Sequence, residues 1–139
     1  MEPFEYYLKA KLARKVSPNQ WRAKSLINDI VLREKFLKQI KIKEFSKIFF
    51  EQLYDIIRDF CDAILFIDGY KSYSHDASIS YLSKKGFDFI SVNKLDFFRY
   101  KRNRSKYYGE PITESDAQDL NEFYLNIKIR LNNAIKGLK

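Results

Sequence analysis

One apolar repeat in the middle of this chain restricts what the chain can fold into. Between residues 45 and 67, large apolar side chains recur every three or four residues, and Gly69 follows shortly after. This spacing places them all on one face of an α-helix, and a glycine readily adopts the left-handed conformation that ends helices. We predict a central core helix that stops at Gly69, with Phe45, Phe49, Leu53, Ile56, Phe60, Ile64 and Ile67 buried.

The rest of the chain also favours helices over strands. Only four Gly and three Pro interrupt 139 residues, and no stretch alternates between apolar and polar residues for long enough to predict a sheet. We therefore predict an all-α fold, a single-domain helical bundle of about five to six helices over residues 1–139. Apart from the central helix, the expected helices cover residues 3–15 (within an N-terminal extension, 1–20), 18–41, 74–86, 93–109 and 113–138.

Capping residues and apolar spacing define two of these helices more closely. Ser17 precedes Pro18, and Gln20 follows, which is the arrangement of a capping box with Ser17 as the N-cap. Thr113 comes before two acidic residues, so a hydroxyl cap is expected there. The predicted buried residues are Trp21, Ile27, Ile30, Val31, Phe36, Leu37 and Ile40 in the earlier helix and Leu120, Phe123, Ile127, Leu131, Ile135 and Leu138 in the last.

The composition excludes several classes of protein. One cysteine, Cys61, allows no internal disulfide, and one histidine, His75, cannot form a structural zinc site alone, so neither a metal nor another cofactor is expected. No apolar run reaches the roughly 18 to 20 residues of a transmembrane helix, and the first residues lack the features of a secretory signal. We expect a soluble, cytoplasmic protein without a membrane partner, whose net charge of +8 attracts anions such as nucleic acid.

A basic segment from Arg99 to Gly109 combines five cations with tyrosines and one asparagine. Arg102 lies four residues after Phe98, so on a helix it continues the apolar stripe and should be partly desolvated, unless the helix has left the core there and the side chain extends into solvent. Asn103 and Tyr107 lie one turn apart. Such a helix offers guanidinium groups for phosphates and phenols for stacking on bases, although ordinary cation–π packing gives the same pattern.

The order Leu-x-x-Phe-Arg-x-x-Arg-Asn-x-x-x-Tyr-x-Gly over residues 95–109 resembles the signature helix of the HEPN (higher eukaryotes and prokaryotes nucleotide-binding) superfamily. Residues 53–65, followed by Gly69, Tyr70, Lys71 and His75, are similar to the family's long helix and its Gly-Tyr-Lys-x-x-x-His turn, so the resemblance covers residues 45–139. It implies a helical bundle that pairs as a homodimer around a shared cleft. It also implies a metal-independent ribonuclease toxin that works with a minimal nucleotidyltransferase antitoxin.

The resemblance also implies roles for individual residues. Arg102, Asn103 and Tyr107 take the catalytic positions, where the family's arginine and histidine promote attack of the ribose 2′-hydroxyl on phosphate. Tyr107 stands in place of that histidine, and because a phenol has a pKa near 10, it argues against full ribonuclease activity. The residues expected to bind nucleic acid are Arg99, Arg104, Lys106 and Tyr108, and Lys71 and His75 are expected either to contact a ligand or to pack and cap a helix.

Two functional hypotheses follow. A third possibility is that the basic surface only keeps the protein soluble. The first is a HEPN-type homodimer that binds RNA or a nucleotide and has weak or absent ribonuclease activity. The alternative is a non-catalytic nucleotide- or protein-interaction module that works with a nucleotidyltransferase partner. Arg102→Ala is expected to abolish RNA binding with little change in thermal stability. The aspartates Asp55, Asp59 and Asp62 are expected on a solvated or salt-bridged helix face, and Cys61 as a buried small side chain.

Overall fold

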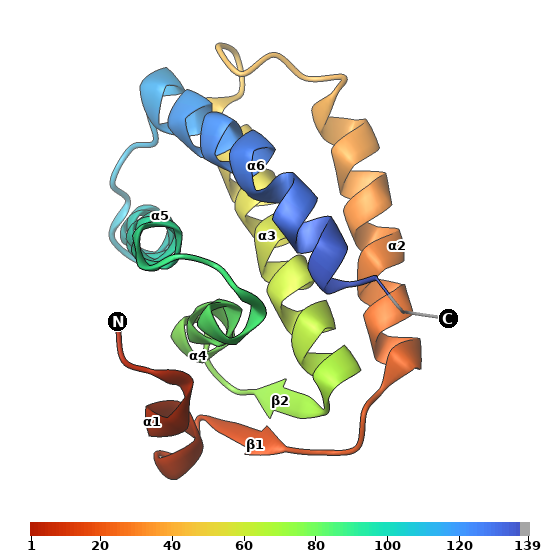
Figure 1. Cartoon of the computed structure of the whole chain (residues 1–139). Helices are drawn as coiled ribbons and strands as arrows, with labels where there is room; N and C mark the ends of the chain where they lie inside the picture. The colour runs from red at the N-terminus through yellow and green to blue at the C-terminus, as the bar shows by residue number, and fades with distance from the viewer. Residues whose placement is uncertain (137–139) are drawn as a thin grey trace.

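The computed structural model describes residues 1–136, and its longest helix, α3 (Ser46–Asp68), runs through the middle of the fold (Figure 1). Two helices, α2 (Gln20–Leu37) and α6 (Glu114–Ala134), pack along α3, while α4 (His75–Ser80) and α5 (Phe89–Tyr108) cover another side of it. This arrangement confirms the all-α bundle that the sequence predicts. The shorter elements are α1 (Phe4–Lys9), the 3₁₀ turn η1 (Tyr81–Lys85), and the strands β1 (Ala13–Lys15) and β2 (Tyr70–Ser72).

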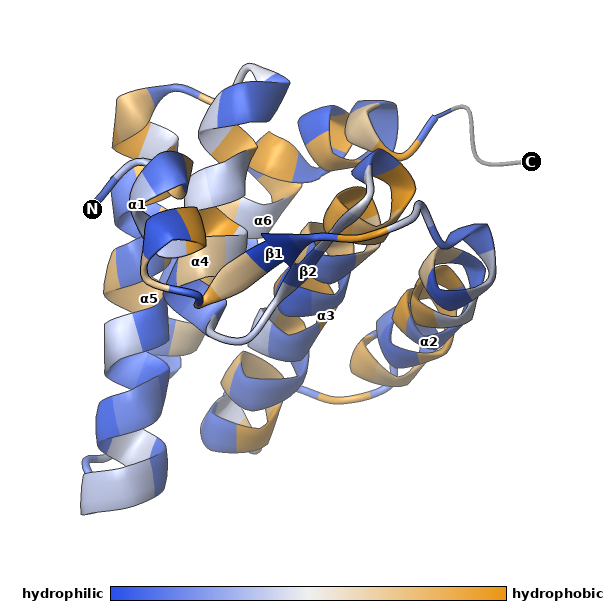
Figure 2. Cartoon of the chain, turned by 90° about the horizontal axis from the view of Figure 1, so that it is seen from below, coloured by the Kyte–Doolittle hydropathy of each residue, from blue (hydrophilic) through white to orange (hydrophobic). Residues whose placement is uncertain are grey.

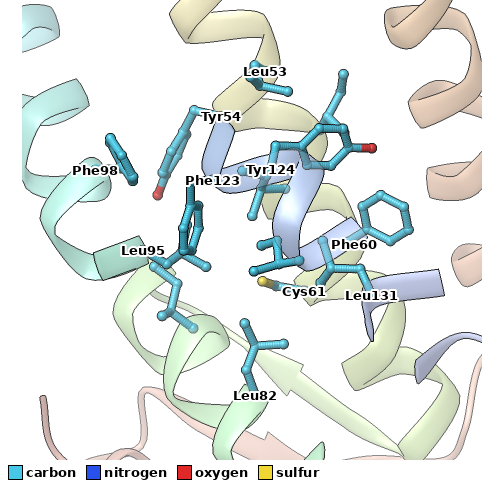
Figure 3. Close-up of a cluster of buried hydrophobic side chains, with 14 of the residues drawn as sticks. Leu53, Tyr54, Phe60, Cys61, Leu82, Leu95, Phe98, Phe123, Tyr124 and Leu131 are labelled. Carbon is cyan, nitrogen blue, oxygen red and sulfur yellow. The ribbon is translucent and has the colours of Figure 1, made fainter. Parts of the chain in front are cut away.

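The apolar stripe of α3 forms the centre of the core, as its spacing predicts. Its members from Phe49 to Ile64 are buried, and burial of side chains of this size contributes roughly 1.5–3 kcal/mol each. Gly69 ends the helix in the left-handed conformation, with φ at +88°. Phe45 departs from the prediction, because it is the N-cap residue and its ring is exposed. Leu82, Leu95, Phe98, Phe123, Tyr124 and Leu131 join the stripe in one cluster (Figure 3).

The N-terminal segment is not the single helix predicted for residues 3–15. The helix α1 ends at Lys9, and Lys11 then adopts a positive φ of 60° that redirects the chain. Ala13–Lys15 pair antiparallel with Tyr70–Ser72, which corrects the expectation that the chain has no sheet. Strands of three residues are too short to show a period-two pattern, and their hydrogen bonds come from a partner that is distant in sequence.

The N-terminal extension is part of the core and not an appendage. The ring of Phe4 packs edge-on against the rings of Tyr70 and Tyr81, with centroids 5.2 and 4.7 Å apart. Tyr7 is also buried. Aromatic pairs in this geometry stabilise a fold beyond the area that they bury, so α1 helps to hold β2 and η1 in place.

The helix α2 begins later than predicted and buries a different face. Its N-cap is Asn19, not Ser17, and the Asn19 side chain accepts a hydrogen bond from the backbone N–H of Arg22. Trp21 was predicted to be buried but is 88% exposed. The face toward α3 is instead the one that carries Ala23, because a small residue there lets the two helix backbones approach. The buried residues of α2 are Ala23, Leu26, Ile30 and Leu37, whereas Val31 and Phe36 are exposed and residues 38–41 lie beyond the helix.

The second half of the chain follows the predictions more closely. Thr113 caps α6 in a complete capping box with Asp116, as expected. Ser74 caps α4, but regular α-helix stops at Ser80 and continues as η1. The helix α5 begins at Phe89, four residues before the predicted start. Leu138, predicted on the buried face of α6, lies outside the described residues. Within residues 1–136, no helix combines the length and the apolar character needed to cross a membrane.

Candidate nucleic-acid interface on α5

The C-terminal half of α5 carries the basic segment, and Figure 2 shows these hydrophilic turns extending past the neighbouring helices. The buried face of α5 comprises Val92, Leu95, Phe98, Arg102 and Ser105. Arg102 is only 9% exposed, which confirms that it continues the apolar stripe and is desolvated. Gly109, with φ at +71°, ends the helix.

Arg102 is held between α5 and α3. Its Nη2 atom lies 3.4 Å from Oδ1 of Asp55, and its guanidinium carbon lies 5.3 Å from the centroid of the Tyr54 ring. Its Nε atom is buried and has no hydrogen-bond partner among the described residues. Since a buried arginine is costly unless it is paired, truncating Arg102 would leave Asp55 without its partner and a void beside Tyr54. The structure therefore opposes the expectation that Arg102→Ala leaves thermal stability unchanged.

Most cations of the basic segment already have carboxylate partners. Arg99 pairs with Asp96 at 2.7 Å, and Lys101 pairs with Asp116 of α6 at 2.7 Å. Arg104 donates from Nε and Nη2 to Glu110, at 2.9 and 2.5 Å, which lowers the pKa of that carboxyl. Among the residues that the structure describes, Lys106 alone of the five has no carboxylate partner within 4 Å. The local excess of positive charge is therefore smaller than the sequence indicates.

The tyrosines at the end of α5 are open to solvent. Tyr107 is 69% exposed and Tyr108 is 71% exposed. The Arg104 guanidinium lies 4.5 Å from the Tyr108 ring, and the Lys106 ammonium lies 5.7 Å from the Tyr107 ring. Exposed rings flanked by cations are the elements from which single-stranded nucleic-acid sites are built.

The three predicted catalytic residues do not share one face within a single chain. A helix turns about 100° per residue, so the five-residue step from Arg102 to Tyr107 separates their directions by about 140°. Arg102 is buried, Tyr107 is exposed, and Asn103 is half-buried on the flank between them. An Arg102–Tyr107 pair acting on one phosphate is therefore not assembled inside this chain.

His75 lies much closer to the basic helix than the sequence suggests. It is the first residue of α4, and its Nδ1 atom is 3.5 Å from the hydroxyl of Tyr54, the residue on which Arg102 also packs. Burial, together with the charges of Arg58, Arg102 and Arg99, lowers the pKa of His75 to about 4. The segment Gly69–Ser74 directs α4 back along α3, and no local sequence pattern predicts that α4 will pack there.

The junction of His75, Tyr54 and Arg58 has no room for a ligand. The cavity that these residues line has a volume of about 10 Å³, which is no more than the space of one water molecule. Lys71 lies elsewhere, exposed on β2, with its ammonium 5.5 Å from the Tyr73 ring. Lys71 and His75 therefore do not form a common ligand site, and His75 packs against α3, which is the other role that the sequence allowed.

The partly buried imidazole of His75 should make the stability of the fold depend on pH. The folded pKa of His75, about 4, lies below its unfolded value near 6.5, so the unfolded chain binds more protons between these values. The stabilising contribution of the neutral ring is thus complete above about pH 6.5 and is lost as pH falls toward 4. After allowance for screening by solvent around the partly buried ring, wild type should lose about 1 kcal/mol more than His75→Gln between about pH 7 and pH 4.5.

Urea unfolding of both proteins at the two pH values measures this difference. Asp59 makes the fold more stable as pH falls, which is opposite to the effect of His75, because burial raises the pKa of Asp59 to about 6 despite its ion pair with Arg33. That contribution is present in both proteins, so it cancels in the comparison. Parallel pH profiles for wild type and His75→Gln would show that the imidazole is not buried in neutral form.

Of the other two aspartates predicted on a solvated or salt-bridged face of α3, Asp59 is salt-bridged, whereas Asp62 is largely buried and has a hydroxyl partner. Asp59 pairs with Arg33 of α2, and Asp62 accepts a hydrogen bond from Ser78 at 3.0 Å. Cys61 is buried, as predicted. No group of three or more potential metal-ligating side chains occurs within residues 1–136.

Comparisons of the chain with protein-family models, curated proteins and solved structures find no match.

Proposed function

We propose that this chain is a HEPN-type homodimer that binds RNA or a nucleotide through the end of α5 and has weak or absent metal-independent ribonuclease activity. The observation that carries the proposal is the pair of exposed rings, Tyr107 and Tyr108, each beside a cation. Bases stack on such rings, and the adjacent cations attract the phosphates. The resemblance of residues 95–109 to the HEPN signature is the basis on which we propose the family.

Two features support low activity over full activity. Arg102 is already engaged by Asp55 and Tyr54, so its charge is not free to stabilise a phosphate transition state without rearrangement. Tyr107 supplies a phenol where catalysis of this type uses imidazole as the base. Binding of RNA requires neither group to transfer a proton.

The homodimer is supported by the outward face of α5. Large apolar side chains in the first part of this helix are exposed in a stripe that ends before the terminal tyrosines, and exposed apolar patches of this kind mark interaction surfaces. A second copy of the same helix is a self-complementary partner for such a stripe. A cytoplasmic location and a minimal nucleotidyltransferase antitoxin belong to the same proposal. The exposed stripe consists of Phe89, Ile90, Phe97 and Tyr100, and Tyr107 and Tyr108 lie beyond its end and stay free for RNA.

One observation favours the alternative, a non-catalytic module that binds a protein partner such as a nucleotidyltransferase. Four of the five cations in the basic segment are ion-paired, and the N-terminal half of the stripe is purely apolar. Apolar contacts with a polar rim are typical of protein interfaces. Under this alternative the chain would bind its partner with no measurable affinity for RNA.

Removing two charges from the end of α5 tests the RNA proposal. We expect Arg104→Gln with Lys106→Gln to weaken binding of single-stranded RNA about five- to tenfold and to reduce the slope of log affinity against log salt by about 1.4. The measurement is fluorescence anisotropy with an oligonucleotide of about 12 nucleotides in chelator. A gel of the same samples reports whether the RNA is cleaved.

The matched control removes the same net charge elsewhere. Lys41→Gln with Lys43→Gln alters two exposed lysines in the α2–α3 connection and should leave RNA affinity almost unchanged. Equal losses in the two double variants would mean that RNA responds only to overall charge, which would contradict the site. No RNA binding by wild type would favour the protein-interaction module, whereas self-association in sedimentation is expected from the homodimer itself and does not separate the two.

A further inference from the structure

The strand pair β1–β2 carries two cations that lack acidic partners. Arg14 and Lys71 are direct partners in the antiparallel register, so their side chains leave the same face of the pair. Both are exposed, whereas Ala13, the position before Arg14, is buried in the core. Figure 2 shows the strand pair in the foreground, with its hydrophilic residues in blue.

This pairing of like charges has an energetic consequence. Neither Arg14 nor Lys71 has a carboxylate within 4 Å among the residues that the structure describes. Like charges directly opposite each other destabilise a strand pair. An anion that lies between the two side chains would remove this repulsion, so the free face of the strand pair favours a negatively charged partner.

A concave hollow of about 170 Å³ lies beside these cations, between α2, the C-terminal half of α3, and β2. Lys71 and Arg22 both line it, and Arg22 has no carboxylate within 4 Å among the described residues either. The acidic residue of the lining, Asp62, is largely buried and accepts a hydrogen bond from Ser78 at 3.0 Å. Three cations, including Arg14, therefore surround a hollow that contains one buried carboxylate.

Exposed aromatic rings adjoin these cations. Trp21, the residue before Arg22 in the first turn of α2, is 88% exposed. On the strand pair, the Lys71 ammonium lies 5.5 Å from the ring of Tyr73, which is also exposed. Unpaired cations beside exposed rings are the combination that binds single-stranded nucleic acid. The basic segment of α5 offers the same combination, but four of its five cations are already paired with carboxylates.

We propose that the face formed by Arg14, Lys71, Arg22 and Trp21, the ribbon face, is a second contact surface for single-stranded RNA. Phosphates lie along Arg14 and Lys71, Arg22 binds a phosphate at the hollow, and a base stacks on Trp21. A concave hollow between cations suits a flexible chain of phosphates, whereas a flat membrane surface would reach only the protruding side chains. This inference rests on the proposed function, because it takes RNA as the ligand, but it does not depend on the site on α5.

Fluorescence of Trp21 tests the ribbon face directly, because Trp21 is the only tryptophan in the chain. Wild type is titrated with oligouridylate of about 12 nucleotides in chelator, and the same samples are followed by anisotropy of a label on the RNA. We expect stacking to quench the tryptophan emission in a saturable way, with the same midpoint as the anisotropy. Free N-acetyltryptophanamide in parallel samples corrects for absorption by the RNA.

Charge-removing variants test the contribution of the two strand cations. We expect Arg14→Gln with Lys71→Gln to weaken RNA binding about five- to tenfold and to reduce the slope of log affinity against log salt by about 1.4. The melting temperature should not fall, because the substitutions remove a repulsion. Arg14→Glu makes the same change in net charge and places a carboxylate opposite Lys71, so it should weaken RNA binding similarly and raise the melting temperature.

The same titrations of Arg104→Gln with Lys106→Gln, and of the control Lys41→Gln with Lys43→Gln, separate the possible failures. The ribbon face is wrong, and the site on α5 stands, if the α5 variant loses affinity while the ribbon variants and the Trp21 emission do not change. A loss confined to the ribbon variants would support the ribbon face and contradict the site on α5.

Two further results would overturn the inference. No RNA binding by wild type would contradict both the ribbon face and the proposed function. An equal loss of affinity in the ribbon variants and the Lys41–Lys43 control would show that RNA responds only to overall charge. Vesicles that contain phosphatidylserine are titrated in parallel, and quenching of Trp21 by these vesicles but not by oligouridylate would assign the face to a membrane and not to RNA.

Discussion

Replacing Gly69 with alanine should lower the free energy of unfolding by about 3 kcal/mol and the melting temperature by about 10 °C. Gly69 has φ at +88°, and a Cβ atom there would lie 2.9 Å from the backbone oxygen of Val16 and 3.3 Å from Cδ of Pro18. The backbone N–H of Val16 also donates to the carbonyl of Gly69 at 2.9 Å. The added methyl group would therefore force the segment after β1 away from the end of α3.

Gly86→Ala is the matched control for this prediction. Gly86 has nearly the same φ, +85°, but a Cβ atom there would meet nothing within 4 Å. Gly86→Ala should lower the free energy of unfolding by about 1 kcal/mol and the melting temperature by about 4 °C, because alanine is strained in the left-handed conformation. Thermal unfolding followed by circular dichroism measures both variants. Similar losses in the two variants would show that residues 16–18 can shift at little cost, and that the close packing at Gly69 does not contribute to stability.

Gly69 ends a helix that local sequence signals predict, whereas its contact with Val16 is a long-range contact that they do not predict. Helix α3 was predictable because its apolar repeat and its terminal glycine are local signals, and the Thr113 cap of α6 is equally local. The strand pair was not predictable, because each strand is formed by hydrogen bonds to residues far away in the sequence. The buried face of α2 depends on Ala23, a residue that scarcely contributes to an apolar pattern but controls how closely two helices pack.

In the candidate site, too, features that depend on local sequence were predictable, and features that depend on distant residues were not. Burial of Arg102 followed from its position one turn after Phe98, which is local information. Its partner Asp55 and the Lys101–Asp116 pair come from other helices, so the extent of charge compensation could not be predicted. The nearness of His75 to Tyr54 likewise arises only when α4 folds back on α3. Exposure of Tyr107 and Tyr108 follows from helix geometry once Arg102 is buried, because both rings lie more than about 100° around the helix from Arg102.

Removing the two exposed rings at the end of α5 should weaken single-stranded RNA binding about 100-fold. Stacking on an aromatic side chain contributes about 1–3 kcal/mol per base by alanine substitution, and two losses of about 1.4 kcal/mol multiply to this factor. Because Tyr107 and Tyr108 are largely exposed, Tyr107→Ala with Tyr108→Ala should change the free energy of unfolding by no more than about 0.5 kcal/mol. Anisotropy titrations in chelator at fixed salt measure the affinity.

Phenylalanine variants separate stacking from chemistry at the hydroxyl. Tyr107→Phe with Tyr108→Phe keeps both rings beside Arg104 and Lys106, so RNA affinity should stay within about twofold of wild type if the rings act by stacking. Tyr6→Ala removes an exposed ring of α1 and should have no effect. Unchanged affinity in the alanine pair would remove the tyrosines from the proposed interface. A large loss in the phenylalanine pair would instead assign the binding to the hydroxyl groups, as hydrogen-bond donors to the phosphate backbone.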